Sequence, residues 1–254
     1  MNSQIGQRAL NSRRSMAFIA GVALLGLALV SSFAYFGVLG SLVVPADPTA
    51  TLNNLIASDG LFRVGIAAFL VVILLDVVVA WSLYVLLRPA NRNLALLMAA
   101  FRLAFSVVFL AALANLLDVA QLLGDPSYVA SVTTASLSAE VTASIASFEN
   151  TWDLSLALFG LHLLALAPLL VRSSLLSKLL AALVLVAGGG YLVDTFGEIL
   201  VPGYSFSVSV FTFVGEALVI VWLLWTALKG VGRQDGALDD ATERRSAQPT
   251  TVTA

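Results

Sequence analysis

The sequence has no cysteine, a single histidine (His162) and few charged residues, which make up 11% of its 254 positions. The lack of cysteine excludes disulfides, thiolate metal sites and thiol catalysis. A His-rich catalytic zinc site needs two or three imidazoles, and a bis-histidine haem needs two, so one histidine disfavours both. The net charge of −2 and the lack of a basic stripe argue against a nucleic-acid partner. We therefore expect no metal, no cofactor and no nucleic acid.

Long apolar runs dominate what is present. A soluble domain carries about 25% charged residues. The deficit here, with 59% hydrophobic residues and a mean hydropathy of +0.97, places the chain among integral membrane proteins. A span needs about 20 predominantly apolar residues. Six such runs occur, at 16–40, 61–87, 94–123, 151–171, 179–200 and 208–228. The first is too long for the apolar region of a signal peptide, so we expect it to remain as a span.

The positively charged residues predict the orientation of these spans. Eleven of the thirteen Lys and Arg residues lie in the N-terminal arm, the C-terminal tail and its flank, or the short connections 88–93 and 172–178. The other two, Arg63 and Arg102, lie inside predicted spans. The longer connections, 41–60 and 124–150, contain none. Because Lys and Arg mark the cytoplasmic side, we predict both termini in the cytoplasm and an even number of spans.

Composition divides the chain into three regions. Residues 1–15 form a cytoplasmic arm, 16–229 a six-span membrane domain, and 230–254 a polar tail. The tail is low in aromatic residues, so we expect it to be disordered.

The two longer connections carry helix signals of their own. Asp47 can cap a helix that begins at Pro48. Within 124–150, the apolar residues recur at helical spacing, at Leu137, Val141, Ile145 and Phe148. We interpret both segments as short amphipathic helices on the outer membrane interface. The predicted fold is therefore all-α, an integral membrane bundle of six transmembrane helices with two short outer interfacial helices.

Charged groups inside the spans need an explanation, because each costs about 2.5–3.5 kcal/mol at mid-membrane on insertion scales. Asp76 and Arg102 lie at depths that a long arginine can bridge, given a rise of about 1.5 Å per residue. We predict that they form an ion pair that fixes the register of the second and third spans. Asp153, beside Trp152, is expected near the membrane surface and is set aside.

The remaining polar residues predict a pocket in the outer half of the bundle. Asp194 and Glu198 lie one helical turn apart on a stripe of small and polar residues in AGGGYLVDTFGE, and small residues let membrane helices approach closely. We expect both carboxylates to point inward and to share a pocket with Glu216, with Arg63 as the nearest cation. The predicted pocket also includes Asp118, Asn115 and His162. In the alternative arrangement Arg63 pairs with Asp118, the other acids bond to backbone, and His162 serves packing.

Three stretches resemble a bacterial family of uncharacterised multi-pass membrane proteins, domain of unknown function 4386. They are PADPTATLNNLIASDGLFRVGI, LYVLLRPANRNLALLMAAFRL and LFGLHLLALAPLLVRSSLLSKLLAALVLVAGGGYLVD, and the resemblance covers roughly residues 12 to 230. The clearest elements are Leu-Tyr-x-Leu-Leu-Arg-Pro at 83–89 and Gly-Tyr-Leu-x-Asp at 190–194. The resemblance implies a bacterial plasma-membrane location and supplies no activity.

Three classes of function fit these observations. The leading one is a protein that binds or transports a proton, a cation or a cationic small molecule through the acidic pocket. The second is a non-catalytic protein, structural, lipid-interacting or accessory, whose buried charges serve packing. An intramembrane enzyme comes third, because no nucleophile accompanies the carboxylates. Membrane lipids are the one partner that every class shares.

Overall fold

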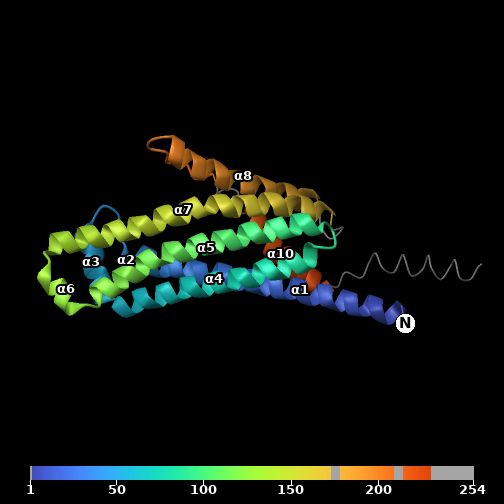
Figure 1. Cartoon of the computed structure of the whole chain (residues 1–254), viewed down its shortest axis with the longest axis horizontal. Helices are drawn as coiled ribbons and strands as arrows, with labels where there is room; N and C mark the ends of the chain where they lie inside the picture. The colour runs from blue at the N-terminus through green and yellow to red at the C-terminus, as the bar shows by residue number, and fades with distance from the viewer. Residues whose placement is uncertain (1, 173–177, 209–213, 230–254) are drawn as a thin grey trace, which may run out of the picture.

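The computed structural model of the chain is an elongated set of helices that run back and forth along one axis (Figure 1). It describes residues 2–172, 178–208 and 214–229, and every regular element in those ranges is helical. The elements are α1 (Asn2–Ser32), the π-helix η1 (Phe33–Leu39), α2 (Gly40–Leu42), α3 (Pro48–Ala57), α4 (Asp59–Leu87), α5 (Arg92–Leu123), α6 (Pro126–Ser131), α7 (Thr134–Arg172), α8 (Lys178–Leu200) and α10 (Val214–Lys229).

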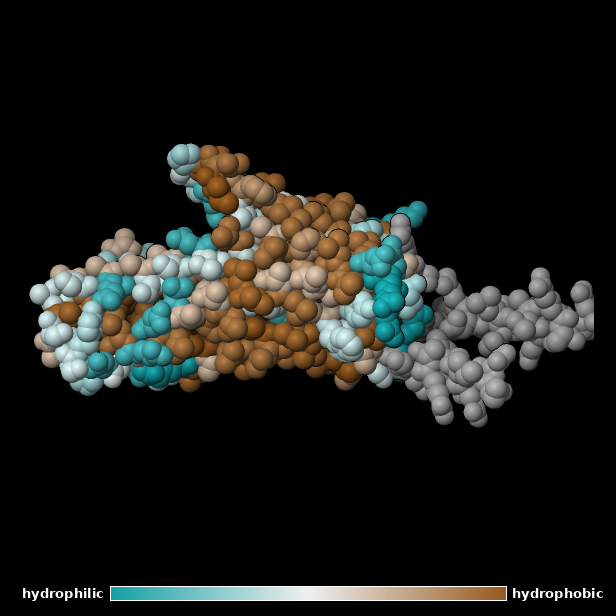
Figure 2. Space-filling model, in the orientation of Figure 1, coloured by the Kyte–Doolittle hydropathy of each residue, from teal (hydrophilic) through white to brown (hydrophobic). Residues whose placement is uncertain are grey.

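Five segments within the described residues are long and apolar enough to cross a membrane: Arg13–Leu42, Asp59–Leu87, Arg92–Leu123, Thr134–Val171 and Lys178–Leu200. α10 is apolar but shorter. The sixth predicted run, 208–228, is only partly described, because 209–213 lie outside the described ranges. Its first residue, Val208, is not helical. The predicted disordered tail at 230–254 also lies outside them. On the face shown in Figure 2, apolar residues cover the middle of the bundle and hydrophilic residues gather at both ends, as in a membrane protein.

Side-chain caps start several helices at the residues where the chain turns. The Asp47 carboxylate accepts a hydrogen bond of 2.8 Å from the backbone N–H of Ala50, so α3 begins at Pro48 as predicted. Asn91 caps α5 in the same way, through the N–H of Leu94. These caps leave short turns at 43–47 and 88–91. The placement of α3 on a membrane surface stays a prediction.

The second predicted outer helix is not a separate element. The structure joins 137–148 and the span at 151–171 into one helix of 39 residues, α7. The physical reason is that no glycine or proline lies between Thr134 and Thr151 to end a helix. The predicted apolar face is nevertheless buried at all four of its positions, Leu137, Val141, Ile145 and Phe148.

The apolar core falls into two clusters along the bundle. One, with Val79 and Met98, lies toward the turn between α4 and α5, which we call the turn end. The other, with Ile73 and Phe105, lies toward α3 and α6, which we call the α6 end. Asp76 follows Ile73 and precedes Val79 along α4, so this residue lies where the two clusters meet.

Close backbone contacts and one arginine hold the last helices in place. Gly160 of α7 and Gly188 of α8 meet at a crossing where neither has room for a side chain. At the turn end, Arg14 of α1 donates hydrogen bonds to the carbonyl oxygens of Ala227 and Leu228, at 2.6 and 3.0 Å. A guanidinium suits the last carbonyls of a helix because they carry partial negative charge. α10 is thereby fixed against α1.

Candidate functional site

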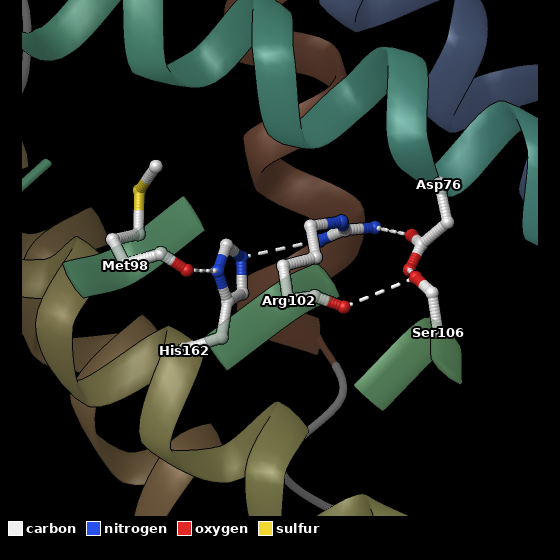
Figure 3. A network of polar contacts seen from close by, with 5 residues as sticks. All are labelled: Asp76, Met98, Arg102, Ser106 and His162. Atoms are coloured by element: carbon white, nitrogen blue, oxygen red, sulfur yellow. Dashed lines mark hydrogen bonds and ion pairs between the residues drawn. The ribbon is translucent and has the colours of Figure 1, made fainter. Parts of the chain in front are cut away.

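A buried polar network lies where the two apolar clusters meet (Figure 3). The Nη2 atom of Arg102 lies 2.5 Å from Oδ1 of Asp76, and the two side chains are 4% and 2% exposed. The hydroxyl of Ser106 lies 2.6 Å from Oδ2 of Asp76 and 3.0 Å from the carbonyl oxygen of Arg102. Because a hydroxyl has one proton, Ser106 donates it to the nearer of these two acceptors, the Asp76 carboxylate. Both oxygens of Asp76 therefore face donors, as an ionised carboxylate requires.

The geometry fixes the protonation of His162. Its Nε2 lies 3.1 Å from Nη1 of Arg102, and its Nδ1 lies 2.9 Å from the carbonyl oxygen of Met98. A guanidinium has only donors and a carbonyl only accepts. Nε2 must therefore accept and Nδ1 must donate, which makes His162 a neutral imidazole of one tautomer. Both ring nitrogens are occupied, so His162 serves the network and has no free atom for a ligand.

Aromatic rings and one more acid complete the network. Phe159 stacks on His162 with ring centroids 5.7 Å apart, and the Arg102 guanidinium carbon lies 5.4 Å from the Phe159 centroid. Tyr191 of α8 meets Phe159 edge-on. Glu216 of α10 lies close enough to both Tyr191 and Arg102 to interact with them electrostatically. Side chains from α4, α5, α7, α8 and α10 thus converge on one point.

Asp194 belongs to a different arrangement, at the end of α8 away from the turn end. Its Oδ1 accepts hydrogen bonds from the Tyr204 hydroxyl at 2.9 Å and from the backbone N–H of Val208 at 2.8 Å. The segment after α8 folds back so closely that a β-carbon on Gly197 would lie 2.5 Å from the Tyr204 ring. Partial burial and the bond to the Asp194 carboxylate raise the pKa of Tyr204. Asp194 therefore fastens the 201–208 segment onto α8.

A second polar site is a pocket between η1 and α7, which we call the acid–aromatic pocket. It has a volume of about 190 Å³ and is lined by Tyr35, Phe148, Glu149, Trp152 and Asp153. Tyr35 comes from the π-helix η1, and such insertions are frequent at functional sites because they change which face a side chain occupies. Its phenol lies within electrostatic range of both carboxylates. No described residue forms a hydrogen bond or ion pair with the carboxylate of Glu149 or Asp153.

The structure distributes the residues of the predicted outer-half pocket over several places. Arg63 lies at the α6 end, where it pairs with Asp59 at 2.9 Å and donates to the carbonyl oxygen of Ala120. Asp118 is exposed, so the alternative pairing of Arg63 with Asp118 does not form either. Asn115 donates to the carbonyl oxygen of its own helix at Ala112.

Two further expectations about that pocket are corrected. Asp194 is buried but Glu198 is exposed, so the prediction that both carboxylates point inward is wrong for Glu198. The cation near Glu216 is Arg102, not Arg63. Ser209 and Thr212, which continue the Glu216 stripe in the sequence, lie outside the described residues.

Sequence reasoning missed most of the acid–aromatic pocket. Glu149 follows the predicted outer helix, and Asp153 was expected to be merely interfacial. The available signal was their spacing of four, which places both on one face of an uninterrupted helix. Nothing in the sequence pattern singles out Tyr35, because a π-helix has no clear sequence signature.

The helical fold with its apolar belt and buried ion pair defines a multi-pass α-helical membrane protein. The profile of the family described as Domain of unknown function (DUF4386) matches residues 19–227, and the chain belongs to this family. The chain is also similar to an "Uncharacterized protein" of Archaeoglobus fulgidus, with 31% identity over 159 residues, which is 63% of this chain and 81% of the relative. No solved structure matches the chain.

Proposed function

We propose that this protein binds a small organic cation in the acid–aromatic pocket. The observation that carries the proposal is the lining: two carboxylates, three aromatic rings and no basic side chain among the described residues. Carboxylates attract a cation from a distance, and aromatic faces stabilise an ammonium group without needing a hydrogen-bond donor from it. Glu198 adds its negative charge to the field at Asp153.

The size of the pocket limits which ligands fit. A volume of about 190 Å³ is below the roughly 300–1,000 Å³ of pockets for drug-sized ligands. A bare metal ion would need converging oxygen ligands, and no group of three or more His, Cys, Asp or Glu residues able to hold one occurs within the described residues. A compact alkylammonium fits both the size and the aromatic walls.

The binding test uses a matched pair of probes on the purified protein in lipid nanodiscs. Choline is expected to bind, and 3,3-dimethylbutanol, its neutral isostere, is not. Glu149→Gln and Asp153→Asn should each weaken choline binding about tenfold or more, which corresponds to about 1.4 kcal/mol. Asp118→Asn, an exposed carboxylate on α5, is the control and should bind as the wild type does. Calorimetric titration gives the dissociation constants, and equal affinity for the charged and neutral probes would refute the proposal.

We further propose six spans, with both termini in the cytoplasm of a bacterial plasma membrane and the acid–aromatic pocket facing the outside. The bias of Lys and Arg supports the orientation. α10 rises only about 24 Å at 1.5 Å per residue, so it needs residues before Val214 to complete a crossing.

Reporter fusions test this topology. Fusions in the turns at Ala46 and Val132 should report the outer compartment. Fusions at Ala90 and after residue 229 should report the cytoplasm, the second only if α10 crosses. An outer signal after residue 229 would leave five spans and would reverse the prediction for the C-terminus.

A structural or accessory role is the second candidate. The observation that favours it is the buried network, in which Arg102 pairs with Asp76 and contacts His162 without any ligand. A network of this kind fixes helix register without binding anything. This role would be the better account if the wild-type protein did not bind choline while substitutions in the buried network still lowered its stability. An intramembrane enzyme stays the third proposal.

A further inference from the structure

The charges of the buried network balance without Glu216. Arg102 carries one positive charge, Asp76 one negative charge, and His162 is neutral by its hydrogen bonds. The guanidinium uses one terminal nitrogen for Asp76 and the other for His162. A second buried carboxylate would therefore give the core a net negative charge.

Glu216 is placed in that core by the way α10 packs on α8. A β-carbon on the preceding residue, Gly215, would lie 2.8 Å from the carbonyl oxygen of Leu183, so the two backbones are in close contact. The Oε1 atom of Glu216 is buried and has no hydrogen-bond partner among the described residues. The Nε atom of Arg102 is also without a partner, and no ion pair joins Arg102 to Glu216 in the described part of the chain.

An unpaired oxygen of this kind is much less costly on a neutral acid than on a carboxylate. Burial in an apolar medium penalises the ionised form, and only an ion pair or several donors offset that penalty. Arg102 is already committed to Asp76, and Tyr191 offers one hydroxyl. A carboxylic acid needs neither charge compensation nor a full set of donors.

We propose that Glu216 is a proton-binding site that holds a proton at neutral pH while Asp76 stays ionised. The groups that face it are Tyr191 from α8 and Arg102 from α5. From α1, Arg14 donates hydrogen bonds to α10 at the far end of that helix, at Ala227 and Leu228. The ligand of this site is thus a proton, and it is separate from the acid–aromatic pocket.

The proton on Glu216 is coupled to the Asp76–Arg102 pair. When Asp76 is ionised, it neutralises Arg102 and Glu216 stays protonated. If Asp76 loses its charge, the guanidinium is left unpaired beside Glu216, and ionisation of Glu216 restores neutrality. In this proposal the two acids together carry one negative charge, which balances the single positive charge of Arg102.

Infrared spectroscopy of the protein in nanodiscs tests the site, because a protonated carboxylic acid has a C=O stretching band that a carboxylate lacks. The wild type should show such a band at neutral pH, and Glu216→Gln should remove it. Asp76→Asn should also remove it, because Glu216 ionises. Tyr191→Phe should keep the band at a changed frequency.

Two comparisons decide the outcome. Glu140→Gln, an exposed acid on α7, is the control and should leave the band unchanged. Identical wild-type and Glu216→Gln spectra in this region would overturn the proposal, as would a band in Asp76→Asn equal to that of the wild type. Should Glu216→Gln fail to fold, the Asp76→Asn and Tyr191→Phe spectra still discriminate, since an ionised wild-type Glu216 predicts no change in either. Choline binding is measured separately, so failure here and failure of the pocket are distinguishable.

Discussion

Replacing Arg102 with Gln is expected to lower the free energy of unfolding by about 3–5 kcal/mol, because it leaves the Asp76 carboxylate buried without a counter-charge. The side chain is 4% exposed, so water does not replace the lost partner. The substitution also removes the donor to His162 Nε2 and the cation over the Phe159 ring. Asp76→Asn should also be destabilising, because it breaks the ion pair with Arg102 and leaves that guanidinium to the less well placed carboxylate of Glu216.

The double variant Asp76→Asn/Arg102→Gln should be more stable than either single variant. Removing both charges removes the cost of an uncompensated ion, and coupling energies within such a pair are typically about 0.5–3 kcal/mol. Reversible unfolding of all four proteins in mixed detergent micelles gives the cycle. Additive single effects would show that the two side chains do not depend on each other.

The chain contains its own control for this experiment. Asp59 and Arg63 form an ion pair at 2.9 Å, one helical turn apart on α4, but both side chains are 45% exposed. An exposed pair contributes roughly 0–1 kcal/mol because water and salt screen it. Asp59→Asn should therefore change stability far less than Asp76→Asn. Burial, rather than the presence of an ion pair, accounts for the expected difference.

Depth along a helix explains which parts of the site the sequence could predict. The rise per residue places Asp76 and Arg102 at compatible depths, and the structure joins them. The same reasoning gives no information about which helices are neighbours. It therefore assigned Arg63 to Glu216, whereas the packing of α10 against α8 places that carboxylate near Arg102.

Local irregularities account for much of the rest. The π-helix at Phe33–Leu39 turns Tyr35 toward Glu149 and Asp153, and hydrophobic periodicity does not predict such an insertion. Helical spacing placed Asp194 and Glu198 on one stripe, but the segment after α8 forms its hydrogen bonds with the Asp194 carboxylate and not with that of Glu198. By contrast, the cap at Asp47 and the buried face of α7 could be predicted, because each depends only on residues close together in the sequence.

The crossing of α7 and α8 should tolerate no added methyl group. A β-carbon on Gly188 would lie 2.7 Å from the carbonyl oxygen of Gly160, and one on Gly160 would lie 2.8 Å from that of Gly188. Both obstacles are backbone, so relief requires the helices to separate. Gly188→Ala and Gly160→Ala should each lower the free energy of unfolding by about 1–3 kcal/mol, the usual cost of overpacking.

Gly189 is the matched control for this crossing, because nothing lies within 4 Å of a β-carbon placed there. Alanine is the better helix former by about 0.8–1.0 kcal/mol, so Gly189→Ala should leave stability unchanged or raise it. Replacing either of these two adjacent glycines with alanine is thus expected to change the free energy of unfolding in opposite directions. Unfolding in mixed micelles measures both changes under one condition. Equal effects at 188 and 189 would mean that helix propensity alone decides, and that the two backbones do not meet at Gly160.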